Sequence, residues 1–363
     1  MKLKIPGHTL AIQPYVPGKP LAELEREYGI TDSIKLASNE NPLGPSPRAM
    51  AAMRAYVARM HRYPDEPGYA LLRGIATRHG VEPQQVMIGN GSDDLLGMLA
   101  CALLQPGDEV IVPTPTFLMY TIVAQTAGAK TVCVPLVNLA IDLDGILSRV
   151  NANTRLIFIC NPNNPTGQVV LRRAFEGFLA RLPEHVVVVV DEAYAEFVRD
   201  SHSIQGLDYL DFGVTVVTLR TFSKAFGLAG LRVGYGVMPT DLAEILNRVR
   251  MPFNVNAMAQ AAATAALDDE RFLEKTIGLV HQQLDWFYEQ LRQRRIGYVP
   301  TQSNFFLIDV ARDATIVFER LLRMGVIVRA MNAYGFPNCI RINIGLPEEN
   351  RRFLSALDKV LNR

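Results

Sequence analysis

Two charged residues that follow predicted strands are the strongest candidates for chemistry. Lys224 lies in RTFSK (220–224), after an apolar stretch, and hydrophobic residues flank it. Burial among such neighbours disfavours the charged form of lysine, so a nucleophilic amine is expected. Asp191 follows five consecutive valines at 186–190, and a carboxylate at the end of a buried strand needs a cationic partner. The sequence therefore predicts a buried site with a reactive amine and an anion.

A second group of residues is suited to binding phosphate. The segment GNGSDD (89–94) precedes an apolar helix, and the N–H groups at a helix N-terminus attract anions. Phe117, in PTPTFLMY (113–120), offers a flat aromatic face. Hydroxyl and guanidinium donors for the same anion are expected from Ser92, Thr221, Ser223 and Arg232. A phosphate site, an amine, a carboxylate and an aromatic face together match the needs of pyridoxal phosphate.

A sheet must position these residues, because they follow short apolar stretches of strand length. The stretches are 109–112, 130–135, 156–160, 186–190, 214–219 and 232–237. Most lack polar and apolar alternation, which is typical of central strands covered on both faces. Helical stretches between them predict a mostly parallel, doubly wound α/β sheet. Ligands bind beyond the carboxyl ends of such strands, so the polar loops are expected to converge on one edge.

The 363 residues are expected to form an arm and two domains. Residues 1–45, rich in Pro and Gly, predict an extended N-terminal arm with one short helix near 20–28, packing with the smaller domain. Residues 46–255 carry the strands and predict the large cofactor-binding domain. Residues 256–363 have a helical pattern up to 293, followed by shorter strands, and predict a small α+β domain.

Composition argues against several classes of function. With 37 Lys and Arg against 36 Asp and Glu, the net charge of +1 argues against nucleic acid as the main partner. The longest apolar run, 95–104, has about half the length of a membrane-spanning helix, so no membrane partner is expected. Four cysteines without a C-x-x-C pair and six scattered histidines predict neither disulfides nor a metal site. A reducing, cytoplasmic location is expected.

The motifs, in their order, resemble those of the fold-type-I pyridoxal-phosphate aminotransferases. Within that family they are most similar to the histidinol-phosphate aminotransferases. Each motif alone is modest evidence, whereas the ordered set is highly specific. They span about residues 13 to 350 and read SNENPLGPSP, YPDEPG, GNGSDD, CNPNNPTG, VDEAYAEF, LRTFSKAFGLAGLRVGYG, RVRMPFNVN and RINIG.

This resemblance implies a role for each matching residue around pyridoxal 5'-phosphate. Lys224 matches the lysine that binds the cofactor aldehyde and moves the substrate proton, and Asp191 matches the partner of the ring nitrogen. Tyr194 and Asn164 match the donors to the phenolic oxygen. Phe117 occupies the stacking position, where these enzymes often carry Tyr. The residues that match the phosphate site are Gly91, Ser92, Asp93, Thr221, Ser223 and Arg232.

The same resemblance implies partners and substrates. Tyr63, in YPDEPG, matches a tyrosine that reaches the cofactor phosphate of a second subunit, which implies a homodimer with shared active sites. The residues at substrate-binding positions are Tyr15, Asn41, Arg329 and Arg341. The implied reaction transfers an amino group from L-histidinol phosphate to 2-oxoglutarate in histidine biosynthesis.

Other functions are weighed against this reading. Arg329 and Arg341 would also suit a substrate carboxylate, so an aromatic or broad-range amino-acid aminotransferase is an alternative. A pyridoxal-phosphate decarboxylase of a phosphorylated amino acid is a weaker one. Residues 186–192 resemble a Walker-B strand, but the chain has no G-x-x-x-x-G-K-[ST], and GNGSDD is not G-x-G-x-x-G. A non-catalytic relative would be expected to lack Lys224 or Asp191, and both are present.

Overall fold

The computed structural model of the chain describes residues 3–14, 24, 26–27, 29–66 and 68–362. The short helix expected near 20–28 falls mainly on residues outside these ranges. Among the described residues, no helix has both the length and the apolar character needed to cross a lipid bilayer.

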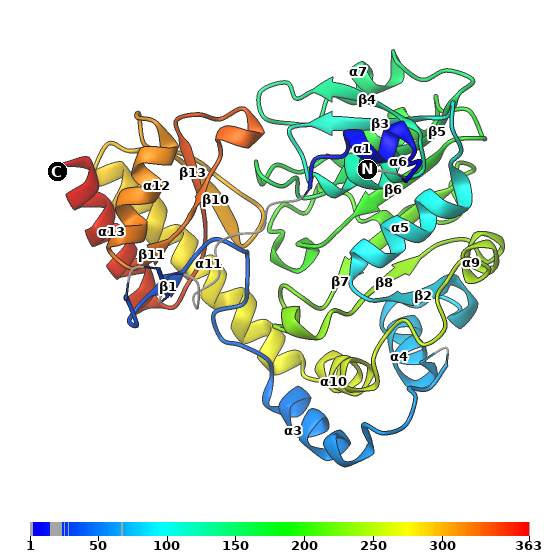
Figure 1. Cartoon of the computed structure of the whole chain (residues 1–363), viewed down its shortest axis with the longest axis horizontal. Coiled ribbons are helices and arrows are strands. Elements are labelled where there is room, and N and C mark those ends of the chain that lie inside the picture. The colour runs from blue at the N-terminus through cyan, green and yellow to red at the C-terminus, as the bar shows by residue number, and fades with distance from the viewer. Residues whose placement is uncertain (1–2, 15–23, 25, 28, 67, 363) are drawn as a thin grey trace.

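A seven-stranded sheet lies at the centre of the larger part of the molecule (Figure 1). Neighbouring strands from β7 to β4 are parallel, whereas β8 is antiparallel to both β7 and β2. The expected α/β fold with a mostly parallel sheet is confirmed. In spatial order the strands are β2 (Val86–Gly89), β8 (Gly234–Val237), β7 (Val216–Thr221), β6 (Val187–Asp191), β5 (Thr154–Cys160), β3 (Glu109–Thr114) and β4 (Lys130–Pro135).

Helices cover both faces of this sheet, which explains why its strands lack alternation. One face packs on α5 (Ser92–Leu103), α6 (Met119–Thr126) and α9 (Thr240–Asn247). The other face packs on α7 (Leu143–Leu147) and α8 (Arg172–Leu179). The expected doubly wound arrangement is therefore present.

Several strand boundaries differ from those expected. β6 and β7 extend to Asp191 and Thr221, so these two polar residues end their strands rather than follow them. The stretch expected at 232–237 becomes a strand only from Gly234, because Arg232 adopts a left-handed backbone with φ of 55°. Strand β2, only four residues long, was not expected from the sequence. Such short elements depend on pairing, here with β8, more than on local propensity.

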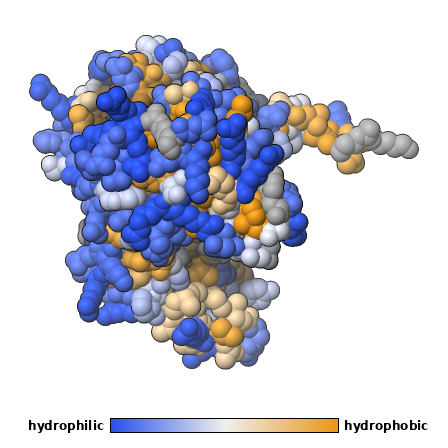
Figure 2. Space-filling model, turned by 90° about the vertical axis from the view of Figure 1, so that its left-hand side faces the viewer, coloured by the Kyte–Doolittle hydropathy of each residue, from blue (hydrophilic) through white to orange (hydrophobic). Residues whose placement is uncertain are grey.

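The C-terminal part contains a second sheet, of four antiparallel strands. Its order is β12 (Arg329–Ala330), β13 (Cys339–Asn343), β10 (Phe305–Asp309) and β9 (Gly297–Val299). It is accompanied by α11 (Glu270–Gln293), α12 (Ala314–Arg323) and α13 (Pro347–Leu361). Figure 2 shows that the surface on this side of the molecule is largely hydrophilic. The smaller unit is thus α+β, as expected.

The arm and the domain boundary differ from what the sequence suggests. Strand β1 (Ile34–Lys35) pairs with β11 (Val326–Ile327) of the C-terminal part, whereas α1 (Gly7–Ala11) contacts α6 of the larger part. Helix α10 (Ala257–Leu267) packs on α3 (Pro47–Tyr56) and α4 (Tyr69–His79) (Figure 1). We therefore propose a boundary near the start of α11 rather than at residue 256.

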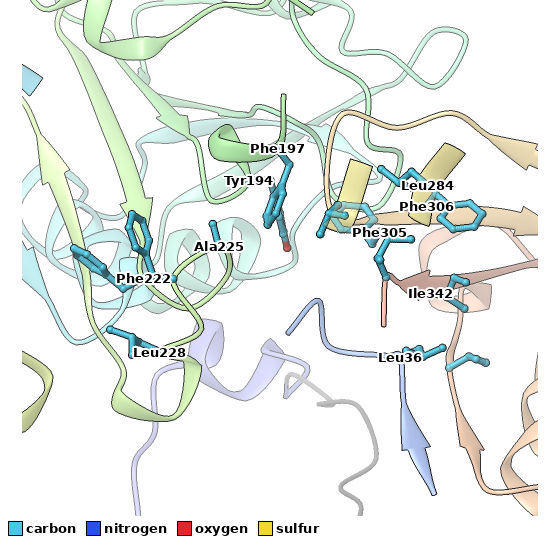
Figure 3. Close-up of a cluster of buried hydrophobic side chains, with 14 of the residues drawn as sticks. Leu36, Tyr194, Phe197, Phe222, Ala225, Leu228, Leu284, Phe305, Phe306 and Ile342 are labelled. Atoms are coloured by element: carbon cyan, nitrogen blue, oxygen red, sulfur yellow. The ribbon is translucent and has the colours of Figure 1, made fainter. Parts of the chain in front are cut away.

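One apolar cluster joins the two parts (Figure 3). Tyr194 lies between the loop that carries Ala225 and the C-terminal sheet, and its ring is 4.9 Å from that of Phe305. Leu36 of the arm packs in the same cluster as Ile342 of β13. Continuous burial across the junction holds the arm, the loop after β7 and the second sheet in fixed relation.

Candidate active site

A cavity of about 350 Å³ lies between the carboxyl edge of the seven-stranded sheet and strands β12 and β13. The polar loops that contain Ser92, Phe117, Asn164, Tyr194 and Lys224 all contribute to its wall, so the convergence predicted at this edge is confirmed. The predicted site residues that line it are Ser92, Asp93, Phe117, Asn164, Asp191, Tyr194, Thr221, Ser223, Lys224, Arg232, Arg329 and Arg341.

Three of the described predicted site residues, Gly91, Asn41 and Tyr63, are not part of the cavity wall in the single chain. Asn41 instead donates to the carbonyl oxygen of Ala225 at 2.8 Å, so it fixes the arm against the loop after Lys224. Tyr63 is 80% exposed and stacks on Phe253 with ring centroids 4.6 Å apart. Tyr15 lies outside the described residues.

Lys224 provides an amine in the cavity wall that loses its proton more readily than an ordinary lysine does. It follows β7 by three residues. Its Nζ atom donates to the carbonyl oxygen of Ser38 at 3.2 Å and lies 5.8 Å from the centre of the Tyr194 ring. Burial, followed by the nearby charge of Arg341, lowers the pKa of Lys224 to about 8. Near neutral pH a useful fraction of this amine is therefore unprotonated.

We expect this pKa to control the capture of an aldehyde by the cofactor-free protein. Below pH 8 the amine is mainly protonated and unreactive, and above pH 8 it is mainly neutral. The rate of imine formation with an aromatic aldehyde should rise with pH with a midpoint near 8, against about 10.4 for an ordinary lysine. Stopped-flow absorbance from pH 6 to 10 measures it, with K224A as the blank. A midpoint above 10 would contradict the proposed environment.

Asp191 is a deeply buried carboxylate held by neutral donors. It ends β6 and is only 2% exposed. The hydroxyl of Tyr120 donates to Oδ2 at 2.7 Å, and the backbone N–H of Ala193 donates to Oδ1 at 3.2 Å. Burial raises the pKa of Asp191 to about 6, although both hydrogen bonds lower it. The carboxylate is therefore ionised at neutral pH and lacks an ion-pair partner among the described residues.

Tyr194 is held by the arm as well as by the sheet loop. Its hydroxyl accepts a hydrogen bond from Nδ2 of Asn39 at 2.9 Å. Asn39 itself has a positive φ of 55°, which asparagine tolerates better than most residues. Its backbone N–H donates to Oδ1 of Asn343 at 3.0 Å, so β13 holds it in place. Burial raises the pKa of Tyr194, which keeps its hydroxyl protonated and able to donate.

Arg341 joins the two walls of the cavity. Its guanidinium donates through Nη1 to Oδ1 of Asn164 at 2.5 Å and through Nη2 to the carbonyl oxygen of Ala37 at 2.9 Å. It also lies 5.1 Å over the ring of Phe305. Arg329 is its antiparallel pair on β12, so two cations face one end of the cavity. An anionic substrate group is the natural ligand for such a pair.

The N-terminus of α5 forms an anion-binding cradle at the other end. Gly91 precedes the helix with φ of 81°, a conformation that side chains rarely adopt. A Cβ atom at Gly234 would lie 2.6 Å from the backbone nitrogen of Ser92, so β8 can approach the helix end only with glycine. Arg232 donates to Oγ of Ser223 and to Asp93, both at 3.3 Å. The cradle thus combines backbone N–H groups with an arginine and hydroxyls.

Some residues at the site were not singled out from the sequence. Asn39 lies in SNENPLGPSP, and Tyr120 ends PTPTFLMY. Lys35, Ser38 and Tyr334 also line the cavity. No local signal distinguishes them, because their place depends on contacts between segments far apart in the chain. Within the described part of the chain, no cluster of three or more His, Cys, Asp or Glu side chains could hold a metal ion.

Comparison with known proteins identifies the family. The family model for class I and II aminotransferases matches residues 31–357. The chain belongs to this family. The aminotransferase is also 46% identical to the histidinol-phosphate aminotransferase of Moorella thermoacetica over 97% of this chain and 92% of that relative. It is 48% identical to histidinol-phosphate aminotransferase 2 of Pseudomonas fluorescens strain Pf-5, over 97% and 96% of the two chains.

Solved structures support the same assignment of the fold. The aminotransferase superimposes on the histidinol-phosphate aminotransferase of Sinorhizobium meliloti with a TM-score of 0.92, 27% identity and coverage of 99% and 98%. That structure was solved in complex with pyridoxal 5'-phosphate. An aspartate aminotransferase from Thermotoga maritima is similar at a TM-score of 0.84, with 25% identity and coverage of 94% and 95%. The family predicted from the ordered motifs is confirmed.

Proposed function

We propose that this aminotransferase uses pyridoxal 5'-phosphate to transfer the amino group of L-histidinol phosphate to 2-oxoglutarate, as a step of histidine biosynthesis. The observation that carries the proposal is one cavity with an anion cradle, the buried amine of Lys224 and the paired cations Arg329 and Arg341. Relatives that are 44–48% identical over nearly the whole chain bear the name histidinol-phosphate aminotransferase, which supports the same donor.

The residues present fit the cofactor. The cradle at α5 offers backbone N–H groups and Arg232 to a phosphate, and Gly234 keeps it open. Asp191 is an ionised carboxylate supported by neutral donors, as a protonated ring nitrogen requires. Phe117 offers an aromatic face for stacking. Tyr194 and Asn164 have polar groups in the same cavity that suit the phenolic oxygen.

Lys224, Asp191 and Tyr194 are proposed to have separate roles in the reaction. When bound, the cofactor supplies an aldehyde and an electron-accepting ring. Lys224 would hold the cofactor by its aldehyde carbon, and its amine would take the proton from Cα of the amino donor. Asp191 holds a proton on the ring nitrogen. Tyr194, fixed by Asn39, orients the ring by donating to its phenolic oxygen.

Arg329 and Arg341 are proposed to bind the anionic end of each substrate. A phosphomonoester and a 2-oxo acid carboxylate both suit two guanidinium groups, so one site serves both half-reactions. Tyr15 and Asn41 remain proposed as supporting residues. Asn41 would act by holding the arm, since its amide binds Ala225 rather than the cavity.

Steady-state rates with a panel of amino donors test the substrate assignment. We expect kcat/KM with histidinol phosphate to exceed that with phenylalanine or tyrosine by at least about 100-fold, because two arginines favour a dianion over a carboxylate. A higher rate with an aromatic amino acid would favour the broad-range alternative. Release of carbon dioxide from a phosphorylated amino acid would favour the decarboxylase.

A homodimer with shared active sites is part of the proposal. Tyr63 and the adjacent Phe253 form an exposed aromatic pair, and Val57, Met60 and Met251 are exposed as well. The lower end of Figure 2, where α3 lies, is paler and more apolar than the rest of that face. Large exposed apolar side chains on a stable protein indicate a protein interface. We also propose a cytoplasmic location, in keeping with four cysteines that are all free thiols.

Subunit mixing tests the shared sites. K224A and Y63A are each expected to be nearly inactive alone. If Tyr63 serves the site of the other subunit, a mixed dimer has one site with both defects and one with none. Random re-association should then restore about a quarter of wild-type activity, since half of the dimers are mixed and each has one working site. Mixing K224A with K224A/Y63A is the control. Absence of restoration, or full activity of Y63A alone, would contradict the assignment.

A further inference from the structure

The hydrogen bond between Tyr120 and Asp191 is a feature that the proposed function does not yet use. Tyr120 is the second residue of α6 and is fully buried. Its hydroxyl lies 2.7 Å from Oδ2 of Asp191. Burial and the Asp191 charge raise the pKa of Tyr120 well above its usual range, so the hydroxyl remains a proton donor.

Packing fixes the position of that hydroxyl. The Tyr120 ring stacks on Phe158 of β5 with centroids 4.7 Å apart and an interplanar angle of 7°. Its edge meets Phe117 at 5.6 Å and 87°. Cys160, which is opposite Asp191 in the sheet register, stays a neutral thiol because burial raises its pKa to about 12. The phenol ring therefore places its donor against one carboxylate oxygen.

We propose that Tyr120 is a positioning residue that keeps Asp191 an anion and directs it at the ring nitrogen of the bound cofactor. This inference rests on the role proposed for Asp191. A hydrogen bond donated to a carboxylate stabilises its charged form. The proton between Asp191 and the ring nitrogen consequently stays on the nitrogen. Without the phenol donor, part of that proton would move to the carboxylate, and the ring would accept electrons less well.

The phenylalanine variant isolates the hydroxyl. Y120F keeps the ring that stacks on Phe158 and removes only the donor. The readout is the ¹⁵N NMR shift of ring-labelled pyridoxal phosphate bound to the resting enzyme, which distinguishes a protonated from a neutral ring nitrogen. We expect the proton distribution to shift toward the carboxylate by about tenfold, which corresponds to one pKa unit. Y209F is the matched control, because Tyr209 is also buried but packs on Phe175 under the opposite face of the sheet.

Two further variants make every outcome decisive. D191N should change the ¹⁵N shift of the ring nitrogen more strongly than Y120F does. An unchanged shift in D191N would refute the role of Asp191 itself. A shift in D191N without one in Y120F would refute the role of Tyr120 alone. A purely structural role would lower the unfolding temperature of Y120F without moving the nitrogen signal. If Y120F does not accumulate as folded protein, Y120F/D191N replaces it. Recovery of folded protein in this double variant would show that Y120F fails because the Asp191 charge is left buried without its donor. Failure of the double variant to fold would overturn the proposal.

Discussion

Replacing Lys224 with alanine is expected to reduce kcat by about 10⁴-fold, because the variant loses both its covalent anchor for the cofactor and its proton carrier. Among the described residues, Lys35 is the other lysine of the cavity wall, and it pairs with Glu40 at 2.8 Å. Steady-state transamination rates at saturating donor measure the loss. Removing a buried amine whose pKa is already low leaves no stranded charge, so the unfolding temperature should fall little.

The matched control is K275A, which removes an exposed lysine on α11. This variant should keep wild-type kcat and cofactor content. Borohydride reduction followed by peptide mapping gives a second measurement, because it marks the lysine that carries the cofactor. Labelling at a lysine other than Lys224, or turnover in K224A above a hundredth of the wild-type rate, would contradict the assignment.

The conservative change R341K is expected to lower kcat/KM by about 100-fold although it keeps the charge. The Arg341 guanidinium donates at the same time to Asn164 and to the carbonyl oxygen of Ala37, and a single ammonium cannot span both. The loss corresponds to about 2.7 kcal/mol, the range for hydrogen bonds to a charged group. Most of it should appear in KM for both substrates, because the anionic end of each is proposed to bind here.

R323K provides the control for the same chemical change, because Arg323 lies exposed at the end of α12. Its kinetics should be unchanged. An unchanged KM in R341K for both the amino donor and the 2-oxo acid would show that the anionic end binds elsewhere. A large effect on one substrate only would separate the two binding modes and contradict a shared site.

The parts of the fold that could be predicted are those with strong local patterns. The valines at 186–190 predicted a central strand, and this strand is present as β6. Strand β2 could not be found in this way, because four residues give too short a pattern. The packing of α10 on α3 and α4 also needed the structure, since an alanine-rich helix does not indicate which neighbour it contacts.

In the site too, residues beside strong local patterns could be predicted, whereas contacts between distant segments could not. Lys224, Asp191 and the GNGSDD turn could be found because each lies close to a stretch with a clear apolar pattern. The contact of Asn39 with Tyr194 could not, because it joins residues 155 positions apart. Arg341 was matched by resemblance, but its role as a bridge from Asn164 to the arm emerges only when both sheets are in place. Pairings between distant segments depend on the whole fold rather than on local sequence.

Helix α11 has a mechanical consequence. Its 24 residues form one continuous rod about 36 Å long at 1.5 Å per residue, starting beside α10 and running under the second sheet. A rod without a break transmits rotation from end to end. Because the two parts also pack together, this rod holds the sheet that carries Arg329 and Arg341 at one angle to the loop of Lys224.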